Sequence, residues 1–146
     1  MNLYNHVLLA VDFYDSDQRV QIRARQIAEQ NGARLSLVHV IENLPISDAA
    51  YGPIPFDVDI TQEWLEASKT RLKVLGDELN VPEDRQYLEI GSAKMEIVRV
   101  ADENSVDLIV VGSHGRHGFA LLLGSTANGV LHHAKCDVLA VRLKDD

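Results

Sequence analysis

The chain is poor in cysteine and has no long apolar run. Cys136 is its one cysteine, so no intrachain disulfide can form, which is typical of a protein from a reducing compartment. No apolar run approaches the roughly 18 residues that cross a bilayer. The first residues, MNLYNHVLLAVDF, lack the charged start and cleavage pattern of a signal peptide. We therefore expect a cytoplasmic protein that makes no membrane contact.

Basic residues are also scarce. The 146 residues include 14 Lys and Arg against 22 Asp and Glu, a net charge of −8. This charge works against long-range attraction to DNA, RNA or anionic membranes, so we predict no nucleic-acid partner. It leaves room for a local pocket that binds one small anion. The length suits a single domain over residues 1–146, which buries on the order of 70% of its unfolded surface.

Two hydrophobic patterns alternate along the chain. Near-continuous aliphatic runs, typical of strands covered on both faces, lie at HVLLAVDF, RLSLVHVI and DLIVVG. Helical spacing lies between the runs, with expected helices ending near Gly32, over residues 61–80, after Ser92 and over residues 125–133. RQYLEI and DVLAVRL complete five expected strands. The alternation predicts an α/β fold, an open parallel sheet with helices on both faces.

One segment interrupts this alternation. Residues 43–60 hold three of the four prolines and are too many for an ordinary connection between a strand and a helix. We interpret them as a flexible flap. Three roles remain open for this flap: a functional lid, a partner contact and a mobile surface loop.

The last expected strand, residues 137–143, bears on assembly. RQYLEI alternates polar and apolar residues, as a solvated edge strand can, but DVLAVRL does not. If DVLAVRL lies at the other edge of the sheet, it offers an unprotected surface for pairing. A symmetric homodimer through this strand is the simplest way to cover it. The alternative is that the strand lies inside the sheet.

A glycine-rich loop, GSHGRHGFALLLGST, follows the expected fourth strand. In an open parallel sheet, ligands bind at the carboxyl ends of strands where the winding reverses, and Asp12 and Gly112 end two such strands. Gly112 and Gly115 allow close backbone approach, and Gly124, Ser125 and Thr126 begin a helix whose N-terminus favours anions. The loop therefore predicts either a phosphate site or a turn followed by a helix cap.

Other chemistries find weaker support in this loop. His114 and His117 lack a cysteine or carboxylate companion at metal-ligand spacing. The Walker lysine is absent, and no G-x-S-x-G elbow accompanies a possible Ser-His-Asp arrangement. We therefore predict no metal site and no catalytic residue.

The same residues carry a resemblance to a known family. HVLLAVDF, ARLSLVHV, VDLIVVGSHGRHG and GSTANGVLHHAKCDVLAVR, which together span nearly the whole chain, are similar to small single-domain bacterial universal stress proteins. The resemblance implies a five-stranded parallel sheet in the order 3-2-1-4-5, so that the first and fourth strands are neighbours. It also implies a homodimer joined through the last strand.

Members of this family that bind ATP carry the motif G-x2-G-x9-G-(S/T). Here Gly112, Gly115, Gly124 and Ser125 match it, but only eight residues separate the second and third glycines. A hydroxyl used by many nucleotide-binding members is replaced by Ala127. By resemblance, the nucleotide would be bound by Ala10, Val11, Asp12, Val40, Val111, Gly112, His114, Gly115, Arg116, Gly124, Ser125 and Thr126.

Three hypotheses follow for the function. The first is a stress-response protein that binds ATP or another adenine nucleotide, with or without Mg²⁺, and acts as a dimeric switch toward an unknown protein partner. The second is a nucleotide-independent dimeric interaction module. The third is an ATPase, for which we expect slow turnover at most, because the sequence near the loop offers no evident general base.

Overall fold

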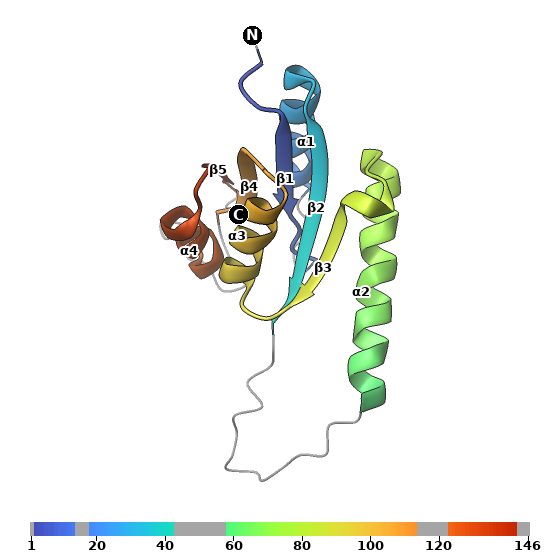
Figure 1. The fold of residues 1–146 in the computed structure, drawn as a ribbon. Helices are drawn as coiled ribbons and strands as arrows, with labels where there is room; N and C mark the ends of the chain where they lie inside the picture. The colour runs from blue at the N-terminus through green and yellow to red at the C-terminus, as the bar shows by residue number, and fades with distance from the viewer. Residues whose placement is uncertain (1, 14–17, 43–57, 114–122, 143–146) are drawn as a thin grey trace.

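The computed structural model describes residues 2–13, 18–42, 58–113 and 123–142. Within these ranges, five strands form one parallel sheet in the order β3-β2-β1-β4-β5 (Figure 1). The strands are β1 His6–Ala10, β2 Arg34–Ile41, β3 Gln86–Ile90, β4 Leu108–Gly112 and β5 Asp137–Val141. The helices are α1 Arg19–Asn31, α2 Val58–Leu79, α3 Ala93–Glu103 and α4 Ser125–His133, with a short 3₁₀ turn, η2 Glu83–Arg85. The predicted fold class and strand order are confirmed.

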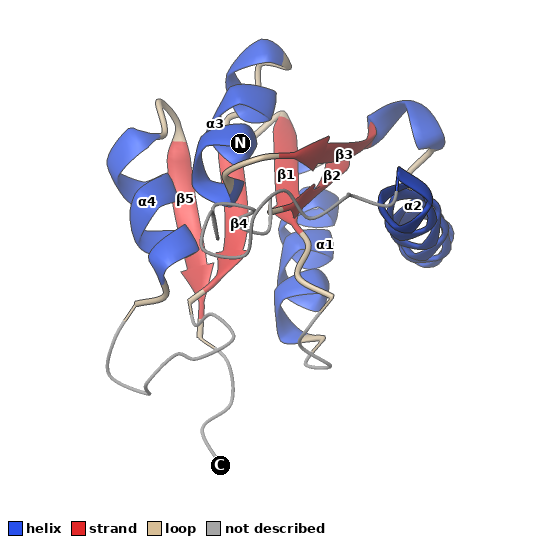
Figure 2. Cartoon of the chain, turned by 90° about the horizontal axis from the view of Figure 1, so that it is seen from below, coloured by secondary structure: helices blue, strands red, loops and turns tan. Residues whose placement is uncertain are grey.

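Helices cover both faces of the sheet, α1 and α2 on one and α3 and α4 on the other (Figure 2). The sheet therefore separates two apolar cores. Successive strand residues point to opposite faces, so Val7 and Leu9 of β1 pack with α1 and α2, whereas Leu8 packs with α3 and α4. In β2, Leu37 packs with α1 and α2 and Val38 packs with α3 and α4. The side chains of these five residues are at most 1% exposed. Because the central strands are covered on both faces, their sequences are aliphatic at consecutive positions rather than at alternate ones.

Three helices end with the same backbone device. Gly32, Asn80 and Ser105 have φ of 61°, 58° and 55°, the left-handed conformation that closes a helix. The N–H after each of them donates to a carbonyl five residues earlier, in the pairs Ala33 to Ala28, Val81 to Gly76 and Val106 to Ala101. Each closure returns the chain toward the sheet, so the strands that follow start at the same edge.

Two expected boundaries were wrong. Helix α2 begins at Val58 rather than at residue 61 and ends at Leu79, so residues 58–60 of the predicted flap are helical. The remaining flap residues, 43–57, lie outside the described residues. Strand β5 ends at Val141, and Leu143 of the predicted dimer strand also lies outside the described part. The alternative of an internal last strand was wrong as well, because β5 is an edge strand.

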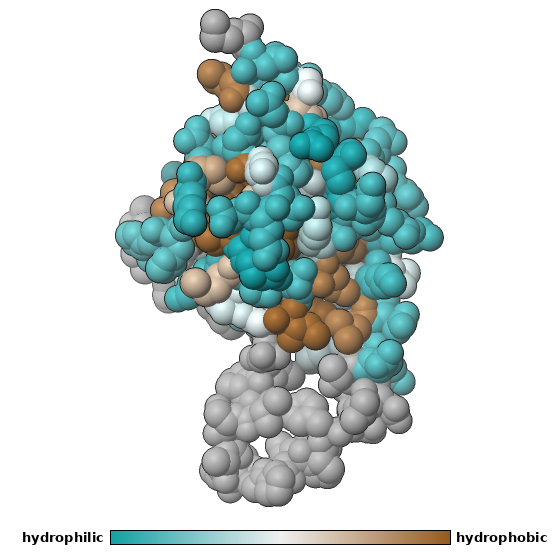
Figure 3. All heavy atoms as spheres, in the orientation of Figure 1, coloured by the Kyte–Doolittle hydropathy of each residue, from teal (hydrophilic) through white to brown (hydrophobic). Residues whose placement is uncertain are grey.

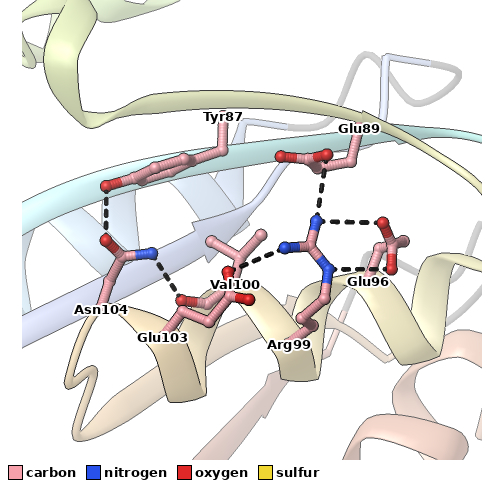
Figure 4. Close-up of polar contacts among 7 residues, drawn as sticks. All are labelled: Tyr87, Glu89, Glu96, Arg99, Val100, Glu103 and Asn104. Atoms are coloured by element: carbon pink, nitrogen blue, oxygen red, sulfur yellow. Dashed lines mark hydrogen bonds and ion pairs between the residues drawn. The ribbon is translucent and has the colours of Figure 1, made fainter.

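Asn104, which follows α3, joins α3, β3 and β1 at the amino ends of the strands, and Figure 4 shows its contacts with Val100 and Tyr87. Its side chain donates to the Val100 carbonyl at 2.8 Å and accepts from the Tyr87 hydroxyl at 3.0 Å. Its backbone carbonyl accepts from His6 Nδ1 at 3.0 Å, and His6 Nε2 lies 2.6 Å from Ser36 Oγ. Burial lowers the pKa of His6, and the Asn104 carbonyl opposes that shift. A neutral imidazole with its proton on Nδ1 satisfies both contacts.

Arg99 ties α3 to the exposed edge strand β3 (Figure 4). Its guanidinium lies 3.1 Å from a carboxylate oxygen of Glu89 in β3. It also contacts Glu96 at 3.0 Å and Glu103 at 2.8 Å within its own helix. The pKa of Arg99 is raised, first by its hydrogen bond to Glu96. Because these side chains remain partly exposed to solvent, we expect the network to contribute little to the stability of the fold.

Candidate functional site

The carboxyl ends of β1 and β4 form the point where the winding of the sheet reverses. β1 and β4 are neighbours, with Val7 opposite Leu108 and Leu9 opposite Val110. From β1 the chain winds outward to β2 and β3, and it then crosses back to β4 and β5 on the other side. Figure 2 views the sheet from this edge. Ligands of open α/β sheets bind outside the strand ends at such a point.

Three predicted site residues lie on one face of the sheet at this edge. Ala10, Val40 and Val111 all pack in the core that α3 and α4 cover, together with Ala127 of α4. Val111 and Ala127 are 2% and 1% exposed, whereas Ala10 and Val40 are half-buried. Small apolar side chains from three neighbouring strands therefore pack together next to the start of α4, where Ala10 and Val40 remain partly exposed.

Val11 points the other way. Its side chain is 8% exposed and packs in the core that α1 and α2 cover. Its N–H donates to the Val38 carbonyl at 2.8 Å. The Val11 side chain therefore cannot contact a ligand on the α3 and α4 side of the sheet, and only its backbone atoms can do so. Asp12, the next residue, is exposed at the edge.

The start of α4 presents backbone donors at the same edge. Gly124 occupies the N-cap position, and as a glycine it has no side chain with which to cap the helix. The Gly124 N–H donates to the Ser113 carbonyl at 2.6 Å, which brings the two ends of the glycine-rich loop together. N–H groups of a first helical turn have no partner within the helix, so the donors suited to an anion begin at Ser125 and Thr126. Ser125 is exposed and Thr126 is half-buried.

The rest of the predicted loop site falls outside the described residues. His114, Gly115 and Arg116 belong to that undescribed segment, so their place at the site remains a prediction from the sequence. Gly112 ends β4, opposite Val141 of β5, and is half-buried. Across the described ranges, no three His, Cys, Asp or Glu side chains gather as a metal site.

The structure adds three residues that sequence reasoning missed, namely Phe13, His39 and Arg71. His39 Nδ1 donates to the Val11 carbonyl at 2.9 Å, and its ring lies 4.6 Å from that of Phe13. Arg71 of α2 donates to the Phe13 carbonyl at 3.1 Å, with its guanidinium 4.5 Å from the Phe13 ring centre. Burial lowers the pKa of His39, and the bond to Val11 opposes that shift. The one signal for these residues in the sequence was His39, a histidine near the end of the mostly aliphatic run RLSLVHVI.

The edge also carries exposed apolar surface. Apolar side chains gather beside α2 near the carboxyl ends of the strands (Figure 3). Ile90, the last residue of β3 and thus at this edge, is 42% exposed. None of the helices within the described ranges has the length and apolar character needed to cross a bilayer.

Comparison with known proteins assigns the family. The sequence model of the universal stress protein family matches residues 3–142. The chain belongs to this family. Universal stress protein A homolog 2 of Coxiella burnetii is 44% identical over 145 residues, which are 99% of each chain.

Solved structures of related proteins agree with the fold. The protein MJ0577, whose structure was used to assign its biochemical function, aligns with a TM-score of 0.80 at 25% identity over 99% of each chain. A universal stress protein in complex with cAMP aligns with a TM-score of 0.58 at 28% identity, covering 94% of this chain and 96% of the other. The family resemblance carried by the sequence is thus confirmed over nearly the whole chain.

Proposed function

We propose that this chain binds ATP or another adenine nucleotide at the carboxyl ends of β1 and β4, and that it acts in the cytoplasm as a homodimeric regulatory switch of the stress response. One observation carries the proposal: the half-buried apolar side chains of Ala10 and Val40, which pack with buried Val111, adjoin both an exposed carboxylate, Asp12, and the start of α4, whose N-cap residue is a glycine. The cAMP complex of a family member supports an adenine nucleotide as the ligand class.

Each part of this edge suits a different part of a nucleotide. Val40 and Ala10 offer an apolar surface for a purine, and the Asp12 carboxylate can accept hydrogen bonds from ribose hydroxyls or the base amine. The N–H groups of Ser125 and Thr126, at the N-terminus of α4, are suited to donate hydrogen bonds to phosphate oxygens. Each such charge-assisted bond contributes roughly 1.5 to 3 kcal/mol. By family resemblance, Gly112, His114, Gly115, Arg116 and the Gly124 cap would complete the phosphate side.

A nucleotide-independent interaction module is the second candidate. Two features favour it: the loop is one residue shorter than the motif of ATP-binding members, and Ala127, where those members often carry a hydroxyl, is 1% exposed within the core. Slow ATP hydrolysis is the third hypothesis, and it is tested separately by measuring phosphate release from ATP in the presence of Mg²⁺.

Calorimetric titration of ligand-stripped protein with ATP, ADP, AMP and cAMP, each with and without Mg²⁺, tests the proposal. We expect saturable binding that Gly115→Leu abolishes, because a bulky side chain would prevent close approach of the loop backbone. Gly118→Leu is the matched control, since Gly118 lies in the same loop but outside the motif. Absence of binding to the unmodified protein would favour the interaction module instead.

The homodimer is proposed through β5. Val141 directs its carbonyl toward Ser113, beyond β4, so the alternate residues Val138 and Ala140 direct their backbone groups toward the open edge. Ala140→Pro removes one outward N–H without removing a bond to β4. Analytical ultracentrifugation should then show a shift from dimer to monomer, and an unchanged dimer would place the interface elsewhere.

A further inference from the structure

The two carbonyls on either side of Asp12 are each held by a side chain from another element. His39 of β2 donates from Nδ1 to the Val11 carbonyl at 2.9 Å. Arg71 of α2 donates to the Phe13 carbonyl at 3.1 Å. Asp12 therefore sits on a short backbone segment that is anchored before and after it, although it is itself exposed.

The two anchors share the Phe13 ring. The His39 and Phe13 rings are 4.6 Å apart and tilted by 55°, and the Arg71 guanidinium lies 4.5 Å from the Phe13 ring centre. Contacts of both kinds stabilise a fixed ring position. Phe13 packs against the core on the α1 and α2 side, opposite the face that carries Ala10, Val40 and Val111. The anchors thus fix the Asp12 segment without occupying the proposed nucleotide surface.

We infer that His39 and Arg71 are positioning residues for nucleotide binding, which fix the backbone around Asp12 so that its carboxylate is already placed for the ligand. The inference rests on the proposed function. A segment that is loose in the free protein has to be ordered when the ligand binds, and ordering one residue corresponds to about a five- to thirtyfold loss of affinity. Neither residue needs to touch the ligand for this effect.

Arg71 also links the site to α2. This helix begins well beyond the carboxyl edge of the sheet (Figure 1). Trp64, the one tryptophan of the chain, lies seven residues before Arg71 and hence two turns along the same side of the helix. It is 48% exposed. Its fluorescence therefore reports on α2 in the neighbourhood of the Arg71 anchor.

Arg71→Met removes the charge and the donor but keeps the aliphatic stem. Lys73→Met is the matched control: it removes the same charge from the same helix at a residue that pairs with Glu83, 3.3 Å away, and not with the Asp12 segment. We expect Arg71→Met to weaken ATP or AMP binding about tenfold, and Lys73→Met to leave it within about twofold. In the ligand-free protein, NMR order parameters at Asp12 and Phe13 should fall in Arg71→Met alone.

His39 is tested by two variants. His39→Asn keeps a donor at the position of Nδ1, whereas His39→Leu keeps apolar bulk without a donor. We expect His39→Asn to retain most of the affinity and His39→Leu to lose about tenfold, with both variants folded by circular dichroism.

A double-mutant cycle tests whether the anchors act through Asp12. In an Asp12→Asn background, Arg71→Met should change affinity by less than about twofold, because the carboxylate that it positions is gone. A bound nucleotide should shift Trp64 emission in the unmodified protein and less in Arg71→Met. Losses that multiply independently, or an equal loss in Lys73→Met, would overturn the inference while leaving the proposed function intact. If the unmodified protein binds no adenine nucleotide, both are overturned.

Discussion

The buried His6 should make the protein less stable in mild acid. Its side chain is 4% exposed, its Nδ1 donates to the Asn104 carbonyl, and its Nε2 accepts from the Ser36 hydroxyl. Protonation would place a second N–H against that hydroxyl in a buried site. Burial accordingly lowers the pKa of His6 in the folded protein. The stabilising contribution is then complete above the unfolded pKa, near 6.5, and is lost as the pH falls below it.

The size of this loss can be bounded. The loss cannot exceed the free energy of protonating this histidine in the unfolded chain, which is about 1.4 kcal/mol between pH 7.5 and 5.5. In His6→Gln, the amide can still donate to Asn104 and accept from Ser36, but it does not titrate.

Urea unfolding of both proteins at pH 7.5 and 5.5 measures the effect. The pH-dependent loss should be smaller in His6→Gln, by up to about 1.4 kcal/mol. Titration of His39 and of the carboxylates is common to both proteins and cancels in the comparison. An identical pH dependence in the two proteins would refute the reasoning.

Three further predictions concern packing and charge. Gly129→Ala should lower the free energy of unfolding, measured in urea, by about 1 to 3 kcal/mol, because the added Cβ would lie 2.8 Å from Lys94 Cβ where α4 meets α3. The control Asn128→Ala, on the exposed side of α4, should change this free energy little. Gly76→Ala should also destabilise the protein, by about 1 kcal/mol or more, because the new Cβ would lie 2.8 Å from the Val81 carbonyl oxygen. This cost outweighs the better helix propensity of alanine, and a higher melting temperature of the variant would contradict the prediction. Arg99→Met should lower the melting temperature slightly in low salt and not in 1 M NaCl, because salt screens the ion pairs that the variant removes. A lower melting temperature that persists in 1 M NaCl would show that packing rather than charge is involved.

Most of the fold was predictable because its signals are local. The expected limits of β2 and of α4 are confirmed at both ends, and Gly32, the expected helix stop, has a φ of 61°. Asn80 and Ser105 close helices in the same way, but such residues are only moderately suited to positive φ and give a weaker signal. The start of α2 was missed because the proline-rich segment before it gives no clear cap.

The site was predictable in part, and for a different reason. Gly112 was correctly expected, from its aliphatic run alone, to end its strand, and Val40, which the resemblance supplied, is the residue before the last one of β2. The expectation that Asp12 ends the first strand was wrong, because β1 ends at Ala10, two residues earlier. The opposite orientation of Val11 follows from strand alternation, but the resemblance transfers contacts residue by residue and does not distinguish side chain from backbone. Arg71 could not be found, because its contact with Phe13 joins positions 58 residues apart and exists only once α2 packs on the sheet.

The division of the sheet into two cores has a consequence for how binding can change through mutation. Val40 and Val111 face one core, and His39 and Phe13 face the other. On the proposed function, we expect substitutions on the Val40 and Val111 side to alter which ligand is recognised, and substitutions on the His39 and Phe13 side to alter how firmly the Asp12 segment is held. Ligand choice and ligand affinity would then be open to separate change, from opposite sides of the same strands.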